Sequence, residues 1–388
     1  MSGVGPALAT GVVIVGWLLG WAVAGRRREL PPAPAGSGAG AGGGGTVSTS
    51  VVVPARDEAE HLPRLLAGLA RAVPAPDEVI VVDDGSVDAT AAVARAAGAR
   101  VVASAPPPGW TGKAQACQRG ADVARGDVLV FLDADVEPGG DVVARLAGAA
   151  ARHRGLVSAH PRHRIERPYE LLSAGIGLVA LLGAGTGATP ARRWWRRPFA
   201  FGPALAVPAG VYREIGGHAA VRSSIVDDVA LARVADDHGV PVVALLGGPD
   251  LRYRMYPGGL GQLIEGWTKN IAAGGMATPP VRLAAAVLWV TAALQAALAA
   301  AGALDLAGPW WVGLAAYGLF AAQFRVLARR IGSFGAVTAA LYPLLLGAFV
   351  LLFAWSLALA LGPGRVRWRG RTIDVRARPG GPHRAVAR

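Results

Sequence analysis

The sequence predicts an α/β domain with a mostly parallel, Rossmann-like sheet and apolar transmembrane helices at both ends of the chain. Short β-branched runs alternate with helical patterns between about Ser50 and Leu132. Strands that alternate with helices favour crossover connections and a parallel sheet covered on both faces. Long uncharged segments lie near the N-terminus and after about Pro280, and acidic residues follow three of the expected strands.

The composition indicates a chain that is partly embedded in a membrane. Of its 388 residues, 53% are hydrophobic and 17% charged, with a net charge of +13. That length predicts two or three structural units. Most clustered basic residues flank apolar segments or lie in the tail, where anionic lipid is the natural partner, so we expect no nucleic-acid partner. The single cysteine, Cys117, excludes an internal disulfide and is typical of a reducing compartment.

Residues 1–28 are predicted to form an N-terminal membrane anchor. The apolar stretch from about Val4 to Ala24 is long enough to cross a bilayer as a helix. Arg26–Arg28 follow this stretch, whereas a signal peptide carries its basic residues before the apolar run. The positive-inside rule therefore predicts an uncleaved anchor, with the next domain in the cytoplasm. Residues 29–49 are rich in Pro, Ala, Gly and Ser and predict a flexible linker.

Three further membrane spans are expected within residues 276–362. Their approximate limits are Val281–Ala303, Pro309–Leu327 and Phe334–Leu361. Arg329–Arg330 fit a cytoplasmic boundary, but three spans after a cytoplasmic domain put the basic tail, residues 363–388, outside, against the charge rule. Because the last span is long and contains Pro343, a re-entrant hairpin is an alternative. The protein is thus expected to be a multi-pass protein of the cell membrane, with the side of its tail left open.

The soluble domain is expected at residues 50–275, and its strands end in polar residues. Its first expected strands are 51–53, 78–82, 101–103 and 127–132, and its first expected helices are 61–72, 89–97 and 113–124. Ligands of parallel sheets bind outside the carboxyl ends of the strands. At that edge the sequence places Asp57–Glu58, Asp83–Asp84, and the pair Asp133 and Asp135.

Helix capping is the alternative explanation for single acids in these loops, and Ser86 and Asp88 are suited to cap the helix near Ala89. Capping does not require paired acids after each strand, and clustered carboxylates repel one another unless a cation or a ligand compensates. On a strand, Asp133 and Asp135 would project to the same side. They are therefore predicted to hold a divalent cation together with substrate phosphates.

Four motifs, in their order and spacing, resemble the nucleotide-binding half of family-2 glycosyltransferases with the GT-A fold. These are Val53–Glu58, Val82–Thr90, Gly109–Ala114 and Leu132–Asp135. The resemblance covers about Ser50 to Gly275 and implies a nucleotide-sugar donor. It implies a donor-binding set of Pro54, Asp57 or Glu58, Asp84, Lys113 and Asp133. It also implies that Asp133 and Asp135 coordinate Mg²⁺ or Mn²⁺ on the diphosphate; a solvated lysine at a helix start is the alternative for Lys113.

The segment Ser224–Leu231 resembles the acidic dyad of this family, whose second acid is the catalytic base. That role maps to Asp228, although Asp227 stands where a glutamate is commoner. Sugar transfer with inversion needs a carboxylate to deprotonate the acceptor hydroxyl. The alternative is that both acids only favour the helix dipole. Phe201–Ala204 and Ile215–His218 look like acceptor-side loops, and the histidine of the second is expected to be structural.

The segment Gln262–Asn270 departs from the processive branch of the family. Processive polysaccharide synthases carry Arg-Trp where this chain has Gly266 and Trp267. The form found here looks more like the branch that glycosylates lipids, including carotenoid, hopanoid and ceramide types. Trp267 either lines the acceptor site or is a plain interfacial tryptophan.

The uncharged stretch Leu171–Ala188 allows three interpretations: a buried helix, a membrane-surface helix or a weak span. Arg192–Arg197, which includes two tryptophans, favours a segment lying on the membrane. Taken together, the sequence predicts a metal-dependent, inverting glycosyltransferase with a UDP-linked donor and a lipid acceptor. A processive polysaccharide synthase and a non-catalytic membrane protein with a degenerate transferase domain are the alternatives.

Overall fold

The computed structural model describes residues 4–24, 28–32, 47–184 and 198–362, and the backbone of 365–368 and 371–374. The chain divides into two compact units. The sheet unit contains the described residues of 28–162 and 188–254. The helical unit contains those of 1–27, 163–187 and 255–375. The domain limits predicted from the sequence, including 50–275 for the transferase domain, follow motifs rather than packing and stay a prediction.

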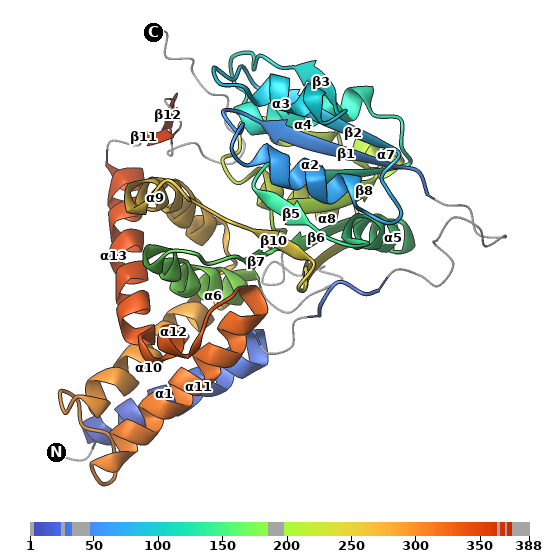
Figure 1. The fold of residues 1–388 in the computed structure, drawn as a ribbon. Coiled ribbons are helices and arrows are strands. Elements are labelled where there is room, and N and C mark those ends of the chain that lie inside the picture. The colour runs from blue at the N-terminus through green and yellow to red at the C-terminus, as the bar shows by residue number, and fades with distance from the viewer. Residues whose placement is uncertain are drawn as a thin grey trace. The chain divides into compact units, whose positions relative to one another are not determined.

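The sheet unit is built on seven strands in the order β3-β2-β1-β4-β8-β6-β9 (Figure 1). The strands are β1 Thr49–Ala55, β2 Glu78–Asp83, β3 Arg100–Ala103, β4 Val128–Leu132, β6 Leu156–His160, β8 Ala204–Pro208 and β9 Val242–Leu246. Strand β8 runs antiparallel to both of its neighbours, and the other pairs are parallel. The predicted mostly parallel α/β sheet is therefore confirmed.

Helices cover both faces of this sheet. They are α2 Leu62–Ala70, α3 Thr90–Ala96, α4 Gly112–Val123, α5 Val142–His153, α7 Ala209–Glu214 and α8 Asp227–Asp237, with the short 3-10 helix η3 Gly217–Val221. On one face, Val52, Ile80 and Phe131 pack against Cys117 of α4 and Leu231 of α8. Every strand and helix predicted between residues 51 and 132 is present, with limits that differ by no more than two residues.

The start of the predicted flexible linker is docked on the sheet. Leu30 N–H donates to the Leu246 carbonyl (2.8 Å), and Leu246 N–H donates to the Arg28 carbonyl (2.9 Å). Glu29 forms a parallel bridge with Leu246 at the end of β9, and Leu30 is buried. Residues 29–30 thus extend the edge of the sheet, unlike the tether predicted for 29–49, of which residues 33–46 lie outside the described chain.

The helical unit contains four helices long and apolar enough to cross a membrane. These are α1 Val4–Ala24, α10 Pro280–Ala300, α11 Trp311–Ile331 and α13 Tyr342–Leu361. The predicted span 334–361 is divided into α12 Ala336–Ala340 and α13. Pro343 lies in the first turn of α13, where its missing N–H removes no helical bond. Within the described residues α13 is one continuous helix of 20 residues, which favours a span over the alternative of a re-entrant hairpin.

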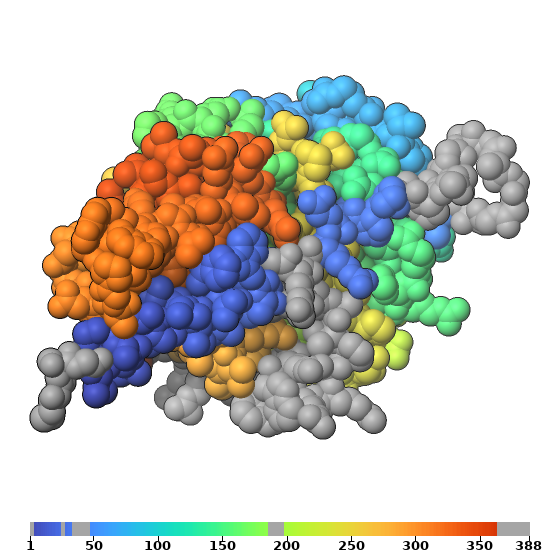
Figure 2. All heavy atoms as spheres, turned by 90° about the horizontal axis from the view of Figure 1, so that it is seen from below, coloured from blue at the N-terminus to red at the C-terminus, as the bar shows by residue number. Residues whose placement is uncertain are grey.

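Helix α1 packs along α10 and α11 (Figure 2). A buried polar group joins the three helices: Trp289 Nε1 donates to Gln323 Oε1 (2.8 Å), and Gln323 Nε2 donates to the Trp17 carbonyl (2.7 Å). Gln323 is fully buried. Such bonds satisfy a polar side chain that would be costly to leave unpaired in an apolar surrounding. Helix α1 is therefore an integral part of the helical unit.

Helix α6, Ser173–Ala184, forms most of the described part of the predicted apolar stretch Leu171–Ala188. Nearly all of its residues are buried, and it contacts α10, α11 and α13 within the helical unit. Of the three interpretations, the buried helix is confirmed for these residues. Residues 185–197, including the predicted membrane-lying segment Arg192–Arg197, lie outside the described chain.

Candidate active site

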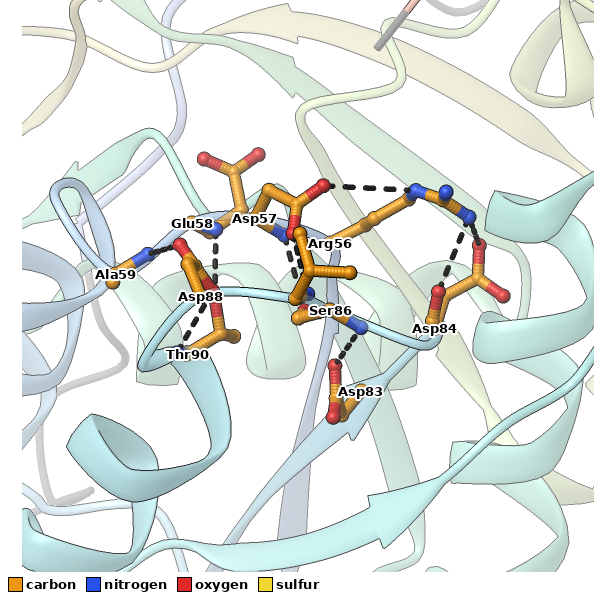
Figure 3. Close-up of polar contacts among 10 residues, drawn as sticks. Arg56, Asp57, Glu58, Ala59, Asp83, Asp84, Ser86, Asp88 and Thr90 are labelled. Carbon is orange, nitrogen blue, oxygen red and sulfur yellow. Dashed lines mark hydrogen bonds and ion pairs between the residues drawn. The ribbon is translucent and has the colours of Figure 1, made fainter. Parts of the chain in front are cut away.

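Two loops at the carboxyl ends of β1 and β2 are joined by hydrogen bonds (Figure 3). Asp57 N–H donates to Ser86 Oγ (3.0 Å), and Val87 N–H donates to Asp57 Oδ1 (2.8 Å). Ala59 N–H donates to Asp88 Oδ2 (3.0 Å). Asp57 has a φ of 52°, a left-handed conformation that aspartate adopts more readily than most residues. Asp88 thus joins the two loops, the α3 N-cap at Ala89 has no side-chain cap bond, and Asp57 is fixed in an unusual conformation at the strand end.

Arg56 lies between the acids of these two loops. Its guanidinium is 3.9 Å from the Asp57 carboxylate and 3.8 Å from that of Asp84 (Figure 3). Asp84 is buried, and a buried carboxylate needs a compensating charge or hydrogen bonds. Arg56 was not among the residues predicted to form the site. In the sequence, Arg56 stands out only as a basic residue directly before the two acidic residues at the end of the first strand.

Glu58 and His61 form a second pair at the end of β1. Glu58 N–H donates to Thr90 Oγ1 (2.8 Å), and the Glu58 carboxylate is 2.8 Å from His61 Nδ1. The bond to Glu58 is the largest cause that raises the pKa of His61, burial opposes it, and the charge of Asp135 adds to it. His61 was expected only as the start of a helix. Its position three residues after Glu58 was the available signal.

Asp133 and Asp135 lie in the turn between β4 and the short strand β5, Val136–Pro138. Val136 N–H donates to the Asp133 carbonyl (3.0 Å) and closes this turn. Strand alternation therefore does not align the two carboxylates, contrary to the prediction, because the turn sets their directions. Asp133 Oδ1 lies 2.6 Å from Lys113 Nζ. Both acids are half-buried.

The carboxylate oxygens of this turn are suited to bind a divalent cation that is also coordinated by oxygens of the substrate. Burial, followed by the charges of Asp227 and Glu58, raises the pKa of Asp133 despite the opposing Lys113 ammonium. A cation bound at this turn would favour the ionised form of Asp133. Among the described residues no group of three or more His, Cys, Asp or Glu could hold a metal alone. Mg²⁺ is commonly bound by one or two carboxylates plus phosphate oxygens.

Asp228 lies in the first turn of α8 and meets Lys113 at the loop that contains Gly202. A Cβ atom on Gly202 would lie 3.0 Å from Asp228 Oδ2 and 3.3 Å from Lys113 Nζ. Burial and then the charge of Asp227 raise the pKa of Asp228 to about 7, against Lys113 and the Val229 N–H. A carboxylate with a pKa near neutrality is suited to accept a proton at physiological pH.

Neighbouring carboxylates keep the Lys113 side chain positively charged. Burial lowers the pKa of Lys113, but Asp133 and Asp227 outweigh burial and raise this pKa well above its ordinary value. The ammonium group is therefore positive and available as a point charge beside the acids. Lys113, Asp133, Gly202 and Asp228 thus form one group, while Asp57 and Asp84 lie at the neighbouring strand ends with Arg56.

Pro54 and Trp267 complete the residues singled out from the sequence. Pro54 is opposite Val82 of β2, beyond the part of β1 that pairs with β4, so its missing N–H costs no bond to β4. Trp267 belongs to α9, Leu260–Ala277, in the helical unit. Its ring centroid is 5.8 Å from that of Tyr256.

The fold and the acidic strand ends define a glycosyltransferase of the GT-A class. Residues 50–230 match the family model described as "Glycosyl transferase family 2". The chain is 32% identical over 338 residues to the 4,4'-diaponeurosporenoate glycosyltransferase of Staphylococcus haemolyticus, covering 85% of this chain and 90% of that protein. It is 32% identical over 333 residues to the protein of that name from Staphylococcus aureus strain MRSA252, covering 84% and 88%. The chain therefore belongs to glycosyltransferase family 2, as the motifs indicated.

Two of the solved structures that resemble the chain are enzymes. The mannosyltransferase PcManGT from Pyrobaculum calidifontis, in complex with GDP-Man and Mn²⁺, is 19% identical, with a TM-score of 0.48 over 87% of this chain and 99% of that one. Glucosyl-3-phosphoglycerate synthase from Mycobacterium tuberculosis is 21% identical, with a TM-score of 0.39 over 60% of this chain and 80% of that one.

Proposed function

We propose that the protein is an inverting glycosyltransferase that transfers one sugar from a nucleotide sugar, expected to be UDP-linked, to a lipid acceptor. The observation that carries this proposal is Asp228, a carboxylate with a pKa of about 7 beside Lys113 and the acidic strand ends. The relatives named for 4,4'-diaponeurosporenoate support an apolar, carotenoid-type acceptor.

In the proposed reaction, Asp228 accepts the proton of the acceptor hydroxyl while that oxygen bonds to the anomeric carbon. The bond from that carbon to the nucleoside diphosphate breaks on the opposite face, which inverts the configuration. Lys113 faces the negative charge of the leaving group. A Mg²⁺ or Mn²⁺ ion held by Asp133 and Asp135 would neutralise further charge on the diphosphate.

The donor nucleoside is assigned to the two joined loops. Asp57, Glu58 and Asp84 lie at the carboxyl ends of adjacent strands, where ligands of such sheets bind. The hydrogen bonds between the loops hold these groups before the donor arrives, which lowers the entropic cost of binding. Pro54 stiffens the end of β1 that leads into them.

The helical unit is proposed to place the protein in the cell membrane as a multi-pass protein with its catalytic residues on the cytoplasmic side. Four apolar helices support the membrane assignment. Arg26–Arg28 after α1 and Arg329–Arg330 at the end of α11 support the orientation. A membrane location would give the protein access to an apolar acceptor.

Transfer of a single sugar is supported by the packing around Gly266. A Cβ atom there would lie 2.2 Å from Tyr256 Cε1. The Tyr256 ring therefore occupies the space that a side chain at 266 needs, so the arginine of processive synthases does not fit beside it. A product carrying one sugar in a mass spectrum would agree with this, and a polymer ladder would contradict it.

The base assignment is tested with Asp228→Asn. We expect sugar transfer into membrane lipids to fall by about 10² to 10⁴-fold, the usual contribution of general base catalysis. Binding of the UDP-sugar, measured by calorimetry, should remain close to wild type. Asp237→Asn, at the exposed far end of α8, is the matched control. Wild-type turnover in Asp228→Asn would refute the assignment of the base.

The metal assignment is tested by chelation. Transfer should be lost in a chelator and restored by Mn²⁺ or Mg²⁺, because without a cation the carboxylates of Asp133 and Asp135 would repel the leaving diphosphate. Full activity in the chelator would refute the metal role while leaving the base assignment standing.

A further inference from the structure

A polar network in the core of the sheet unit reaches the residue beside the proposed base. Tyr212 Oη lies 2.8 Å from His218 Nδ1, and the backbone N–H of His218 donates to the same hydroxyl (3.0 Å). Tyr212 Oη also lies 3.2 Å from Gln118 Oε1. Tyr212 and His218 are 2% and 1% exposed, so their polar atoms have only each other and their protein neighbours. His218 Nε2 faces Asp227 Oδ2 at 3.8 Å.

The two glycines before His218 build this contact. Gly216 and Gly217 have φ values of 77° and 54°, in the left-handed region that glycine tolerates best. A Cβ atom on Gly217 would lie 2.5 Å from Tyr212 Cε1. The Phe131 ring packs against both Tyr212 and His218, with centroids 5.4 and 5.1 Å away. The Gly-Gly-His motif therefore serves to bring the imidazole under the tyrosine.

The direction of each hydrogen bond follows from the groups around Gln118. Gln118 Nε2 donates to Asp122 Oδ1 (2.8 Å), and Gln118 Oε1 accepts from Ala219 N–H (3.0 Å). This orients the amide so that its oxygen faces Tyr212. The single hydroxyl proton of Tyr212 then has two acceptors, Gln118 Oε1 and His218 Nδ1, and the second is the nearer by 0.4 Å, from 3.2 and 2.8 Å.

The tautomer of His218 is set by Tyr212 at Nδ1 and Asp227 at Nε2 together. Burial lowers the pKa of His218 to about 4, so its imidazole is neutral and carries one proton. If Tyr212 donated to Gln118, that proton would be on Nδ1, and the bare Nε2 would face the Asp227 carboxylate. Donation from Tyr212 to Nδ1 instead leaves an N–H at Nε2, directed at Asp227. Attraction between this N–H and the carboxylate favours the second arrangement.

We propose that His218 is a positioning residue for sugar transfer: Tyr212 selects the tautomer whose Nε2–H faces Asp227, and this N–H keeps that carboxylate in place beside Asp228. At 3.8 Å the interaction is electrostatic rather than a full hydrogen bond. The proposal rests on the proposed function of Asp228 as the base. Neither His218 nor Tyr212 touches the reacting atoms; both act through Asp227.

The position of Asp227 matters because it is joined to the base by one peptide bond in the first turn of α8. Its charge is also the second cause, after burial, that raises the pKa of Asp228. The other charged groups that face this pair are Lys113 from α4 and Asp133 after β4. A displaced Asp227 would therefore change both the place and the basicity of Asp228.

The test compares His218→Gln with His218→Met. The two replacements have similar length and flexibility, but only glutamine carries an N–H near the position of Nε2. We expect kcat to fall about tenfold in His218→Met, an effect typical of groups that orient a catalytic residue, with the KM for the nucleotide sugar unchanged. His218→Gln should recover most of this kcat. Equal kcat values in two variants of equal thermal stability would overturn the proposal.

Tyr212→Phe tests the role of the hydroxyl. This variant keeps the ring contact with Phe131 but frees the tautomer, so we expect a drop in kcat smaller than that of His218→Met. A drop larger than that of His218→Met would show that Tyr212 acts by another route and would overturn this part.

If Asp228→Asn kept wild-type turnover, the base assignment itself would fail. Loss of activity in Asp228→Asn with equal His218 variants would refute only the positioning role.

Discussion

The two ends of the proposed site hold their acids in different ways. At the ends of β1 and β2, backbone N–H groups and the Arg56 guanidinium contact the carboxylates of Asp57 and its neighbours. At the start of α8 and after β4, one ammonium, Lys113, serves both Asp133 and Asp228, and burial raises the pKa of each. The first arrangement joins its two loops by hydrogen bonds before a ligand binds. The second gathers two acids with raised pKa values around one ammonium group, as is common at catalytic sites.

This comparison predicts two kinds of variant. A change at the transfer end, around Lys113 and Asp228, should lower kcat, because it alters groups that act in the transition state. A change at the donor end, around Arg56, should raise the KM for the nucleotide sugar and leave kcat nearly intact. The variants below test this separation.

Lys113→Met should have the largest effect. It removes the charge that lies 2.6 Å from Asp133 and close to Asp228, and leaves an apolar side chain of similar length. We expect kcat to fall about 100-fold, a typical cost of losing one group that stabilises transition-state charge. Single-turnover transfer with saturating donor measures this. The control Arg119→Met removes an exposed charge from the same helix and should change little; equal losses in both variants would contradict the role of Lys113.

Gly202→Ala should have an intermediate effect. Its Cβ atom would lie 3.0 Å from Asp228 Oδ2 and 3.3 Å from Lys113 Nζ, so one of these groups must shift. Because small misplacements of reacting groups cost up to about 100-fold, we expect kcat to fall about tenfold in this milder case. Gly210→Ala is the matched control, since nothing lies within 4 Å of a Cβ atom there. An unchanged kcat in Gly202→Ala would show that the two groups do not depend on their spacing.

Sequence periodicity was sufficient for the four strands from β1 to β4 and for the strand ends that carry the acids, whereas β6, β8 and β9 were not predicted. Apolar residues recur every two residues in a strand and every 3.6 residues in a helix, and this pattern is visible within a short segment. The elements from β1 to β4 were therefore predicted closely. The turn at Asp133 was not predicted, because the alternation of side chains along a strand does not show where the strand ends. Pro343 led to the alternative of a re-entrant hairpin, and not to the short helix α12 followed by the long helix α13. Mean hydropathy does not register a change of helix when both parts are apolar.

The contacts missed by the sequence join distant segments. Gly202 approaches Asp228 and Lys113 only because β8 leads its loop to the carboxyl end of β4. Leu30 docks on β9 although the residues around it have the composition of a linker. Such contacts depend on which strands become neighbours, and a single sequence carries no local signal for that. Arg56 was visible in its motif, but its partners were known only once β1 and β2 lay side by side.

Arg56→Met should have the smallest effect and is the sharpest test of the donor end. The guanidinium lies 3.9 and 3.8 Å from Asp57 and Asp84, and its side chain is about a quarter exposed, so solvent screens part of the interaction. We expect the KM for the nucleotide sugar to rise about threefold, the scale of one partly exposed ion pair, with kcat within twofold of wild type. Arg71→Met, on the opposite end of α2 from the site, is the control. A fall in kcat comparable to that of Lys113→Met, with KM unchanged, would show that Arg56 acts on the transfer step and would remove the distinction between the two ends.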